Sequence, residues 1–148
     1  MTPAHSLPSR TELVAITVEG AVGRITLNAP ERLNAVDADM LESISDGVSA
    51  LGAHPDVRVI TLTGTGRGFC SGAHLSAVSS LDDVGATTLD CVGRAIRTLI
   101  ASRVPVLGLV NGVTAGVGFS LALATHYVLA TESASFLLGF NKIGLMPD

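Results

Sequence analysis

The sequence predicts a single layered α/β domain, and three observations lead to this fold class. Short runs rich in Val, Ile, Leu and Thr alternate with longer segments whose apolar residues recur every three or four positions. The length of 148 residues leaves room for one domain, residues 1–148, and 47% of these residues are hydrophobic, enough for a real core. A repeated strand-then-helix order is typical of layered α/β proteins.

The first half of the chain predicts a hairpin, a helix and a buried strand. Residues 13–18 and 22–27 are two β-prone runs separated by a short turn, which indicates a hairpin. In residues 37–51 the apolar side chains share one helical face, and Asp37 stands where an N-cap is expected. Residues 57–63 form a β-branched run that ends at a glycine, which indicates a buried strand followed by a loop.

The second half predicts further strands and helices in alternation. Residues 76–87 are small and polar without a clear period, so we expect a surface loop there. An amphipathic helix follows over 88–102 and a strand over 106–110. Residues 115–125 are apolar on nearly all sides, which predicts a helix buried against the sheet, and 127–130 reads as a short strand.

Composition restricts the function classes. The net charge is −4, and the nine Lys and Arg form no stripe, which argues against nucleic acid or a membrane surface and favours a small-molecule ligand. Two cysteines, Cys70 and Cys91, fit neither a disulfide framework nor a metal site, so we expect no metal and a cytoplasmic location. Residues 1–10 lack a signal-peptide core and should be flexible, and the apolar stretch 117–130 is too short to span a bilayer.

Two glycine-rich segments are the candidate site. Residues 67–75 follow a buried strand, and residues 110–118 lead from a strand into a buried helix. Glycines let the backbone turn sharply and point N–H groups outward, so two such loops facing each other could stabilise a developing oxyanion. Neither segment has the ending of a phosphate-binding P-loop. On spacing alone, the alternative that these glycines only turn the chain stays open.

Four segments resemble the enoyl-CoA hydratase/isomerase (crotonase) family. Residues 67–75, Arg-Gly-Phe-Cys-Ser-Gly-Ala-His-Leu, are similar to the family's Phe-Cys-x-Gly-Ala-Asp-Leu stretch, and residues 110–118 to its Asn-Gly-x-x-x-Gly-x-Gly stretch. Residues 27–35 and 143–148 agree with its opening loop and with the start of its active-site helix. The resemblance implies a crotonase-like spiral of ββα units, here without the family's C-terminal helices. It also implies an acyl-CoA ligand whose thioester enolate is held by two backbone N–H groups, those of Ala73 and Val117.

The resemblance implies further site residues and an assembly. No separate cofactor is expected, because CoA is part of the substrate, and a homo-oligomer, the family's trimer, is expected if a longer chain exists. Arg32 and Arg67 would lie near the ADP phosphates of CoA, although both could equally be solvated loop side chains. The substrate-binding set is Arg32, Arg67, Gly72, Gly116, Gly118, Ser120 and Phe140.

Two departures from the family pattern decide the expected chemistry. Family hydratases carry glutamates where this chain has Ser120 and Phe140, and neither side chain transfers protons as a carboxylate does. Asp148 matches an aspartate of some isomerase members, and a single carboxylate suffices to shift a double bond. Isomerisation is therefore favoured over hydration, with Asp148 as acid and base. The alternative for Asp148 is a helix cap after Pro147.

Other interpretations stay open. The loss of both glutamates is also compatible with a non-catalytic or truncated acyl-CoA binder. Ser120 in a Gly-Phe-Ser-Leu-Ala context suggests a thioester hydrolase, but His126 lies on roughly the opposite side of the predicted helix, so no Ser–His contact is expected. His74 should be a solvated loop side chain whose replacement by Ala matters little. Cys70 should be buried and inert.

Overall fold

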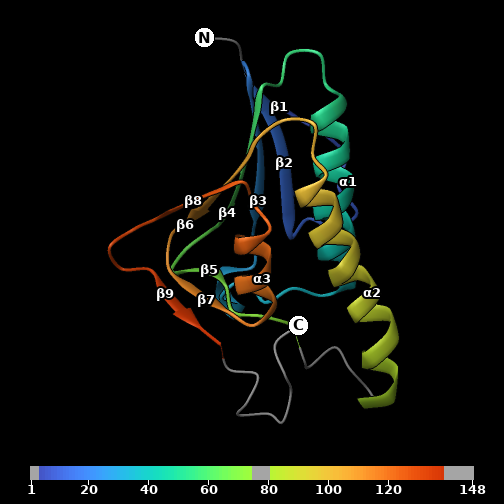
Figure 1. Cartoon of the computed structure of the whole chain (residues 1–148), viewed down its shortest axis with the longest axis vertical. Coiled ribbons are helices and arrows are strands. Elements are labelled where there is room, and N and C mark those ends of the chain that lie inside the picture. Colours follow the sequence, from blue (N-terminus) through green and yellow to red (C-terminus); the bar gives the residue numbers. More distant parts are fainter. Residues whose placement is uncertain (1–3, 75–80, 139–148) are drawn as a thin grey trace.

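The computed structural model describes residues 4–74 and 81–138, in which strands and helices alternate along the chain (Figure 1). In chain order the elements are β1 His5–Ser6, β2 Val14–Glu19, β3 Val22–Leu27, the 3₁₀ turn η1 Pro30–Arg32, α1 Ala38–Ala53, β4 Val59–Gly64, β5 Gly68–Cys70, α2 Leu81–Ile100, β6 Val106–Val110, β7 Val113–Ala115, α3 Val117–Leu123, β8 Tyr127–Ala130 and β9 Ser135–Leu137. The hairpin, both long helices and the strands at 59–64, 106–110 and 127–130 confirm the predicted order.

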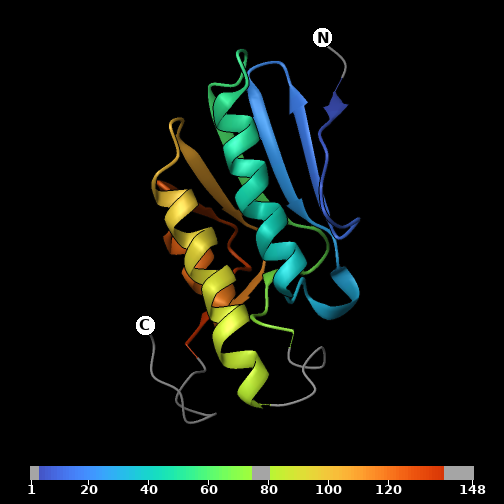
Figure 2. The same cartoon turned by 90° about the vertical axis from the view of Figure 1, so that its right-hand side faces the viewer.

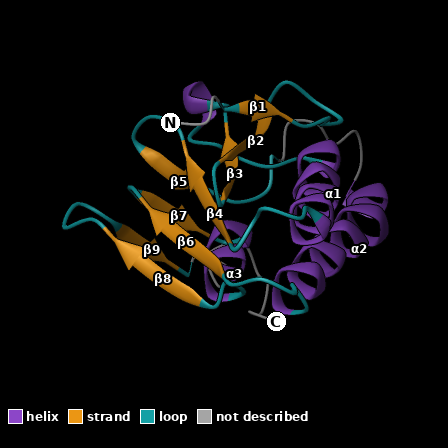
Figure 3. Ribbon diagram, turned by 90° about the horizontal axis from the view of Figure 1, so that it is seen from above, coloured by secondary structure: helices purple, strands orange, loops and turns teal. Residues whose placement is uncertain are grey.

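The strands form two sheets (Figure 3). The large sheet has the order β1-β2-β3-β4-β6-β8, antiparallel from β1 to β3 and parallel beyond, and the small sheet is β5-β7-β9, all parallel. After the β2–β3 hairpin and α1, each turn of the chain adds one strand to the large sheet, one to the small sheet and then a helix. This is the expected crotonase-like spiral of ββα units, in which the chain crosses from the large sheet to the small sheet at β4–β5, β6–β7 and β8–β9.

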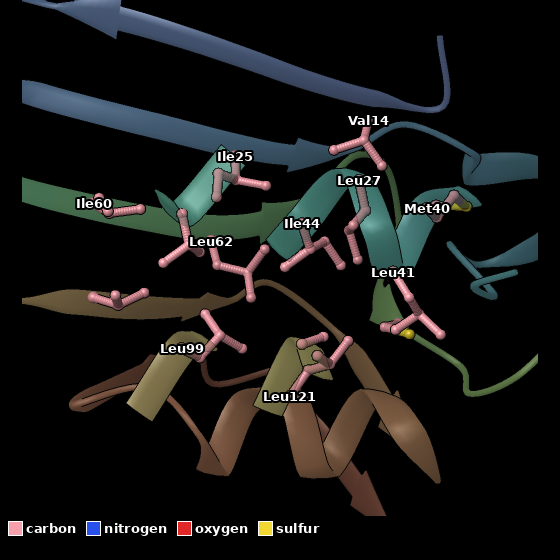
Figure 4. Close-up of a cluster of buried hydrophobic side chains, with 14 of the residues drawn as sticks. Val14, Ile25, Leu27, Met40, Leu41, Ile44, Ile60, Leu62, Leu99 and Leu121 are labelled. Atoms are coloured by element: carbon pink, nitrogen blue, oxygen red, sulfur yellow. The ribbon is translucent and has the colours of Figure 1, made fainter. Parts of the chain in front are cut away.

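Helices α1 and α2 pack side by side, with α1 against β2, β3 and β4 of the large sheet and α2 also against α3 (Figure 2). Asp37 caps α1 as predicted, because its carboxylate accepts a hydrogen bond from the Met40 N–H at 3.0 Å. Figure 4 shows the buried side chains of β3 and β4, such as Ile25 and Leu62, facing those of α1, such as Ile44. Each such side chain contributes roughly 1.5–3 kcal/mol when fully buried. The core therefore holds the strand ends in fixed positions.

Several predicted boundaries were wrong. Helix α2 begins at Leu81, so the expected surface loop over 76–87 is helical from that residue on; residues 75–80 lie outside the described part. A weakly periodic segment can extend a helix once the rest of that helix is packed. Strands β5, β7 and β9 were missed because three residues are too few to show a period. At the N-terminus His5–Ser6 pairs with β2, where we expected flexible chain.

The helix expected over residues 115–125 is shorter, Val117–Leu123, and only part of it is buried. Helix α3 buries Gly118, Leu121 and Ala122, whereas Leu123 is 64% exposed. The helix contacts β5, β6, β7 and α2. Tyr127 on the neighbouring edge strand β8 is 70% exposed.

Over residues 4–74 and 81–138, no helix has both the length and the apolar character that crossing a membrane requires.

Candidate functional site

The two glycine-rich segments meet, although Gly72 and Gly116 lie 44 positions apart in sequence. Gly72 has φ +115° and Gly116 has φ +53°, conformations that L side chains rarely adopt. A Cβ built on Gly116 would lie 3.7 Å from the Gly72 Cα, and one built on Gly72 would lie 3.3 Å from the Ala115 carbonyl oxygen. The absence of side chains at these two positions lets the backbone before Ala73 approach the backbone before Val117.

The N–H groups of Ala73 and Val117 donate no hydrogen bond to the backbone of the described residues. Residues 72–74 pair with Val36, since Val36 N–H donates to the Gly72 carbonyl and His74 N–H donates to the Val36 carbonyl, both at 2.8 Å. In such a bridge the N–H of the middle residue, Ala73, points to the other side. Val117 is the first residue of α3, where an N–H has no partner within the helix. Among hydrogen bonds between described residues, neither N–H is a donor.

Two asparagines hold the loop that carries β5. Asn34, fully buried and with φ +56°, donates from its side-chain amide to the Thr65 and Gly68 carbonyls at 2.9 and 2.8 Å and accepts from the Ala29 N–H at 2.8 Å. Asn111 donates to the Gly66 carbonyl at 3.0 Å. Neither asparagine was predicted to have this role. The available signal was the presence of asparagine in glycine-rich turns, where its side chain commonly bonds nearby backbone.

Arg32 joins the start of α1 to the segment beside Ala73. Its guanidinium donates to the Asp37 carboxylate at 2.8 Å and lies 3.0 Å from Nδ1 of His74, while its Nε is buried and has no partner among described residues. His74 is half-buried and held, so the expectation of a solvated side chain was wrong. A hydrogen-bond partner 42 residues away decides its environment, and no local pattern reveals that.

Comparison with known proteins identifies the family. The sequence profile of the enoyl-CoA hydratase/isomerase family matches residues 17–148. The chain belongs to this family. The alignment begins within β2 and includes both glycine-rich segments.

Named relatives agree with this assignment. The chain is 36% identical over 142 residues to a 1,2-epoxyphenylacetyl-CoA isomerase of Escherichia coli K12, which covers 93% of this chain and 54% of the relative. It is 40% identical over 131 residues to a probable enoyl-CoA hydratase of Rhodobacter capsulatus, covering 84% and 48%. The crystal structure of an enoyl-CoA hydratase from Mycobacterium avium subsp. paratuberculosis superposes with a TM-score of 0.85 at 37% identity, covering 93% and 55%. The chain thus spans about half the length of these family members.

The remaining predicted site residues fall into two groups. Arg67 is exposed at the start of its glycine-rich segment, and Ser120 is half-buried in α3, four residues after Gly116. Phe140 and Asp148 lie outside the described residues. The structure therefore brings Ser120 to the helix that begins beside the paired glycines, and leaves the other family glutamate position and the proposed acid/base without a described position.

Ser120 and His126 make no hydrogen bond to each other in the described part of the chain. The Nδ1 atom of His126 accepts a hydrogen bond from the Val106 N–H at 3.1 Å, and the imidazole makes no hydrogen bond to Ser120. The ring is thus committed to the first residue of β6. In this family member Ser120 has no base from His126.

Arg32 and the arginines of α2 have different surroundings. Arg32 is already engaged by Asp37 and His74, so contact with a CoA phosphate would require it to share or release these partners. A cavity of about 610 Å³ lies between α1 and α2, lined in part by Arg94 and Arg97, and none of its lining residues comes from the glycine-rich segments.

Across residues 4–74 and 81–138, no three His, Cys, Asp or Glu side chains gather as metal ligands.

Cys70, fully buried beside Gly118, should react slowly with thiol reagents at pH 8. Burial raises the pKa of its thiol from an ordinary 9.0 to about 11. The unfolded chain loses this proton at lower pH than the folded chain, so the free energy of unfolding should fall between about pH 9 and about pH 11. The fall should reach roughly 2–3 kcal/mol. Urea unfolding of native chain and Cys70→Ala across this range measures the difference, and parallel pH dependences would contradict the prediction.

Proposed function

We propose that this chain binds an acyl-CoA thioester, stabilises its enolate with the N–H groups of Ala73 and Val117, and shifts a double bond in an enoyl-CoA. The observation that carries the proposal is the approach of Gly72 to Gly116, which sets these two N–H groups, donors to no described residue, on neighbouring segments. Preorganised backbone donors of this kind act where negative charge develops, and losing one typically costs roughly 10²–10³-fold in rate.

The names of relatives support a CoA thioester as the ligand class. They include a 1,2-epoxyphenylacetyl-CoA isomerase, a probable enoyl-CoA hydratase and, from Gallus gallus, a 3-hydroxyisobutyryl-CoA hydrolase that is 32% identical over 140 residues. These reactions differ, but all three substrates carry the same thioester. Exposed Arg67 is the free candidate for the CoA phosphates, because the guanidinium of Arg32 is already engaged.

Isomerisation needs one acid/base, and we assign that role to Asp148. Its carboxylate removes a proton from C2 of a 3-enoyl-CoA, and the negative charge moves to the thioester oxygen between the Ala73 and Val117 N–H groups. The same proton is returned at C4, which leaves the double bond between C2 and C3 and regenerates the carboxylate. No water is consumed, so the step needs only one carboxylate. The two glutamates of family hydratases, at the positions of Ser120 and Phe140 in this chain, are therefore not required.

A non-catalytic acyl-CoA binder is the second candidate. Ser120 on α3 cannot replace a family glutamate as a proton donor at neutral pH, and this favours binding without turnover. A thioester hydrolase is disfavoured, because His126 is bonded to the backbone of Val106.

Any turnover is expected to be isomerisation that depends on Asp148. We expect native protein to convert 3-hexenoyl-CoA to 2-hexenoyl-CoA and Asp148→Asn to lose roughly 10²–10⁴-fold, the usual contribution of a positioned acid/base. Both thioesters are followed in parallel by chromatography of the acyl-CoA products, with free CoA measured in the same samples.

Each outcome of this assay selects one candidate. Efficient formation of 3-hydroxyhexanoyl-CoA would refute the preference for isomerisation, and release of free CoA would indicate a hydrolase. Undiminished isomerisation in Asp148→Asn would remove this residue from the mechanism. Butyryl-CoA binding without turnover would favour the non-catalytic binder.

A further inference from the structure

The segment that carries Ala73 is anchored to the chain before α1 at every residue except Ala73. Ser71 donates from its N–H to the Leu33 carbonyl at 3.0 Å and from its hydroxyl to the Arg32 carbonyl at 3.1 Å. Gly72 and His74 flank the Val36 backbone with two hydrogen bonds. The hydrogen bonds of Ser71, Gly72 and His74 therefore set the direction of the Ala73 N–H. Of these three neighbours, His74 is the one that follows Ala73 in the chain.

The contact between Arg32 and His74 determines the state of the imidazole. A guanidinium has N–H donors and no acceptor, so at 3.0 Å from Arg32 Nη1 the Nδ1 atom of His74 must be the acceptor. Nδ1 then carries no proton, and the single ring proton sits on Nε2. A doubly protonated ring would set a cation against a cation and leave Arg32 without this acceptor. The contact exists only for neutral His74.

Arg32 is itself fixed from the other side by the start of α1. Its second terminal nitrogen donates to Oδ2 of Asp37 at 2.8 Å and lies 3.1 Å from the Met40 sulfur, and the side chain is only 21% exposed. The other oxygen of Asp37 caps α1. The charged groups that face His74 among described residues are thus Arg32 directly and Asp37 behind it. The helix cap at Asp37, the guanidinium of Arg32 and the imidazole of His74 form one chain of hydrogen bonds.

We propose that neutral His74 is a positioning residue for the Ala73 N–H, acting through the Arg32–Asp37 pair at the start of α1. The inference rests on the proposed function for the meaning of the Ala73 N–H and assigns His74 a role that sequence analysis had denied it. His74 orients the donor and does not exchange protons with substrate. A misplacement of the donor by about 1 Å can cost up to roughly 10²-fold in rate.

The test compares variants that keep or move the acceptor. His74→Asn places its amide oxygen near the position of Nδ1 and should preserve the bond to Arg32, whereas His74→Gln places the oxygen farther out, near Nε2, and should lose it. Asp37→Ser keeps a capping oxygen for α1 but removes the carboxylate that holds Arg32. The first two readouts need no ligand: the nitrogen-15 spectrum of the imidazole, which reports its tautomer, and the Ala73 amide signal.

We expect the ring proton on Nε2 in native protein at pH 7.5. The Ala73 amide signal should stay near its native position in His74→Asn and move in His74→Gln and Asp37→Ser. Butyryl-CoA affinity should fall about tenfold in the last two, within the range that misplacement allows.

The readouts separate failure of this inference from failure of the proposed function. A ring proton on Nδ1, or an Ala73 amide that responds equally to His74→Asn and His74→Gln, would overturn the positioning role. If native protein does not bind butyryl-CoA, acyl-CoA binding fails, while the tautomer and the amide signal still decide whether His74 orients Ala73.

Discussion

Replacing Gly118 by Ala is expected to abolish acyl-CoA binding and to lower the free energy of unfolding by about 3 kcal/mol. A Cβ at this position would collide with the Cys70 carbonyl oxygen and lie 2.7 Å from the Cys70 Cβ. Both partners are buried, so either β5 or the first turn of α3 must move. That movement separates the two segments that carry the Ala73 and Val117 N–H groups. Urea unfolding and titration with butyryl-CoA measure the two effects, and Val at the same position should be more severe.

Gly52 offers a matched control for the same substitution. A Cβ on Gly52 meets nothing within 4 Å, and the residue lies within α1, so Gly52→Ala should stabilise the protein by up to about 1 kcal/mol.

Gly116→Val should impair acyl-CoA binding through backbone strain, because φ +53° is strained for a β-branched residue. Native stability and native affinity in Gly118→Ala would show that β5 and α3 are not packed as described.

Replacing Asn34 by Ala is expected to destabilise the protein by about 3–5 kcal/mol, since it leaves the buried Ala29 N–H and the part-buried Thr65 carbonyl without this partner and the Gly68 carbonyl with only the longer bond from Asn111, at roughly 1–3 kcal/mol for each lost bond. The groups are the Ala29 N–H and the Thr65 and Gly68 carbonyls, all within 2.9 Å of the Asn34 side chain. Gly68 begins β5, so the loss also frees the strand that precedes Gly72. Acyl-CoA affinity should fall even under conditions where the variant remains folded.

Asn28→Ala and Asn34→Asp complete this experiment. Asn28 is exposed and accepts one hydrogen bond, from the Thr65 hydroxyl at 3.3 Å, so its removal should change stability by less than about 0.5 kcal/mol. Asn34→Asp keeps an acceptor for Ala29 but turns a carboxylate oxygen toward two carbonyls, and should be as damaging as Ala. Equal stabilities of Asn28→Ala and Asn34→Ala in urea would disprove the bridging role of Asn34.

The sequence by itself was sufficient for whatever depends on neighbours along the chain. The three- and four-residue spacing of apolar residues and the cap at Asp37 predict α1, and the β-branched run predicts β4, because both signals arise from local geometry. The motifs around Gly72 and Gly116 were enough to indicate the family, and the profile over residues 17–148 confirmed it. Catalytic assignments to Phe140 and Asp148 stay predictions, since both lie outside the described residues.

Only the tertiary structure decided which distant groups meet. Strands β5, β7 and β9 are too short to carry a period, and they exist because each pairs with a strand from another turn of the spiral. His74 was expected in solvent, yet its ring accepts from Arg32, 42 residues earlier, and Asn34 bonds the Gly68 carbonyl across 34 residues. Local sequence sets the conformations that a segment can adopt. The partner that satisfies a buried polar atom is set by the packing of sheets and helices, which is a property of the whole chain.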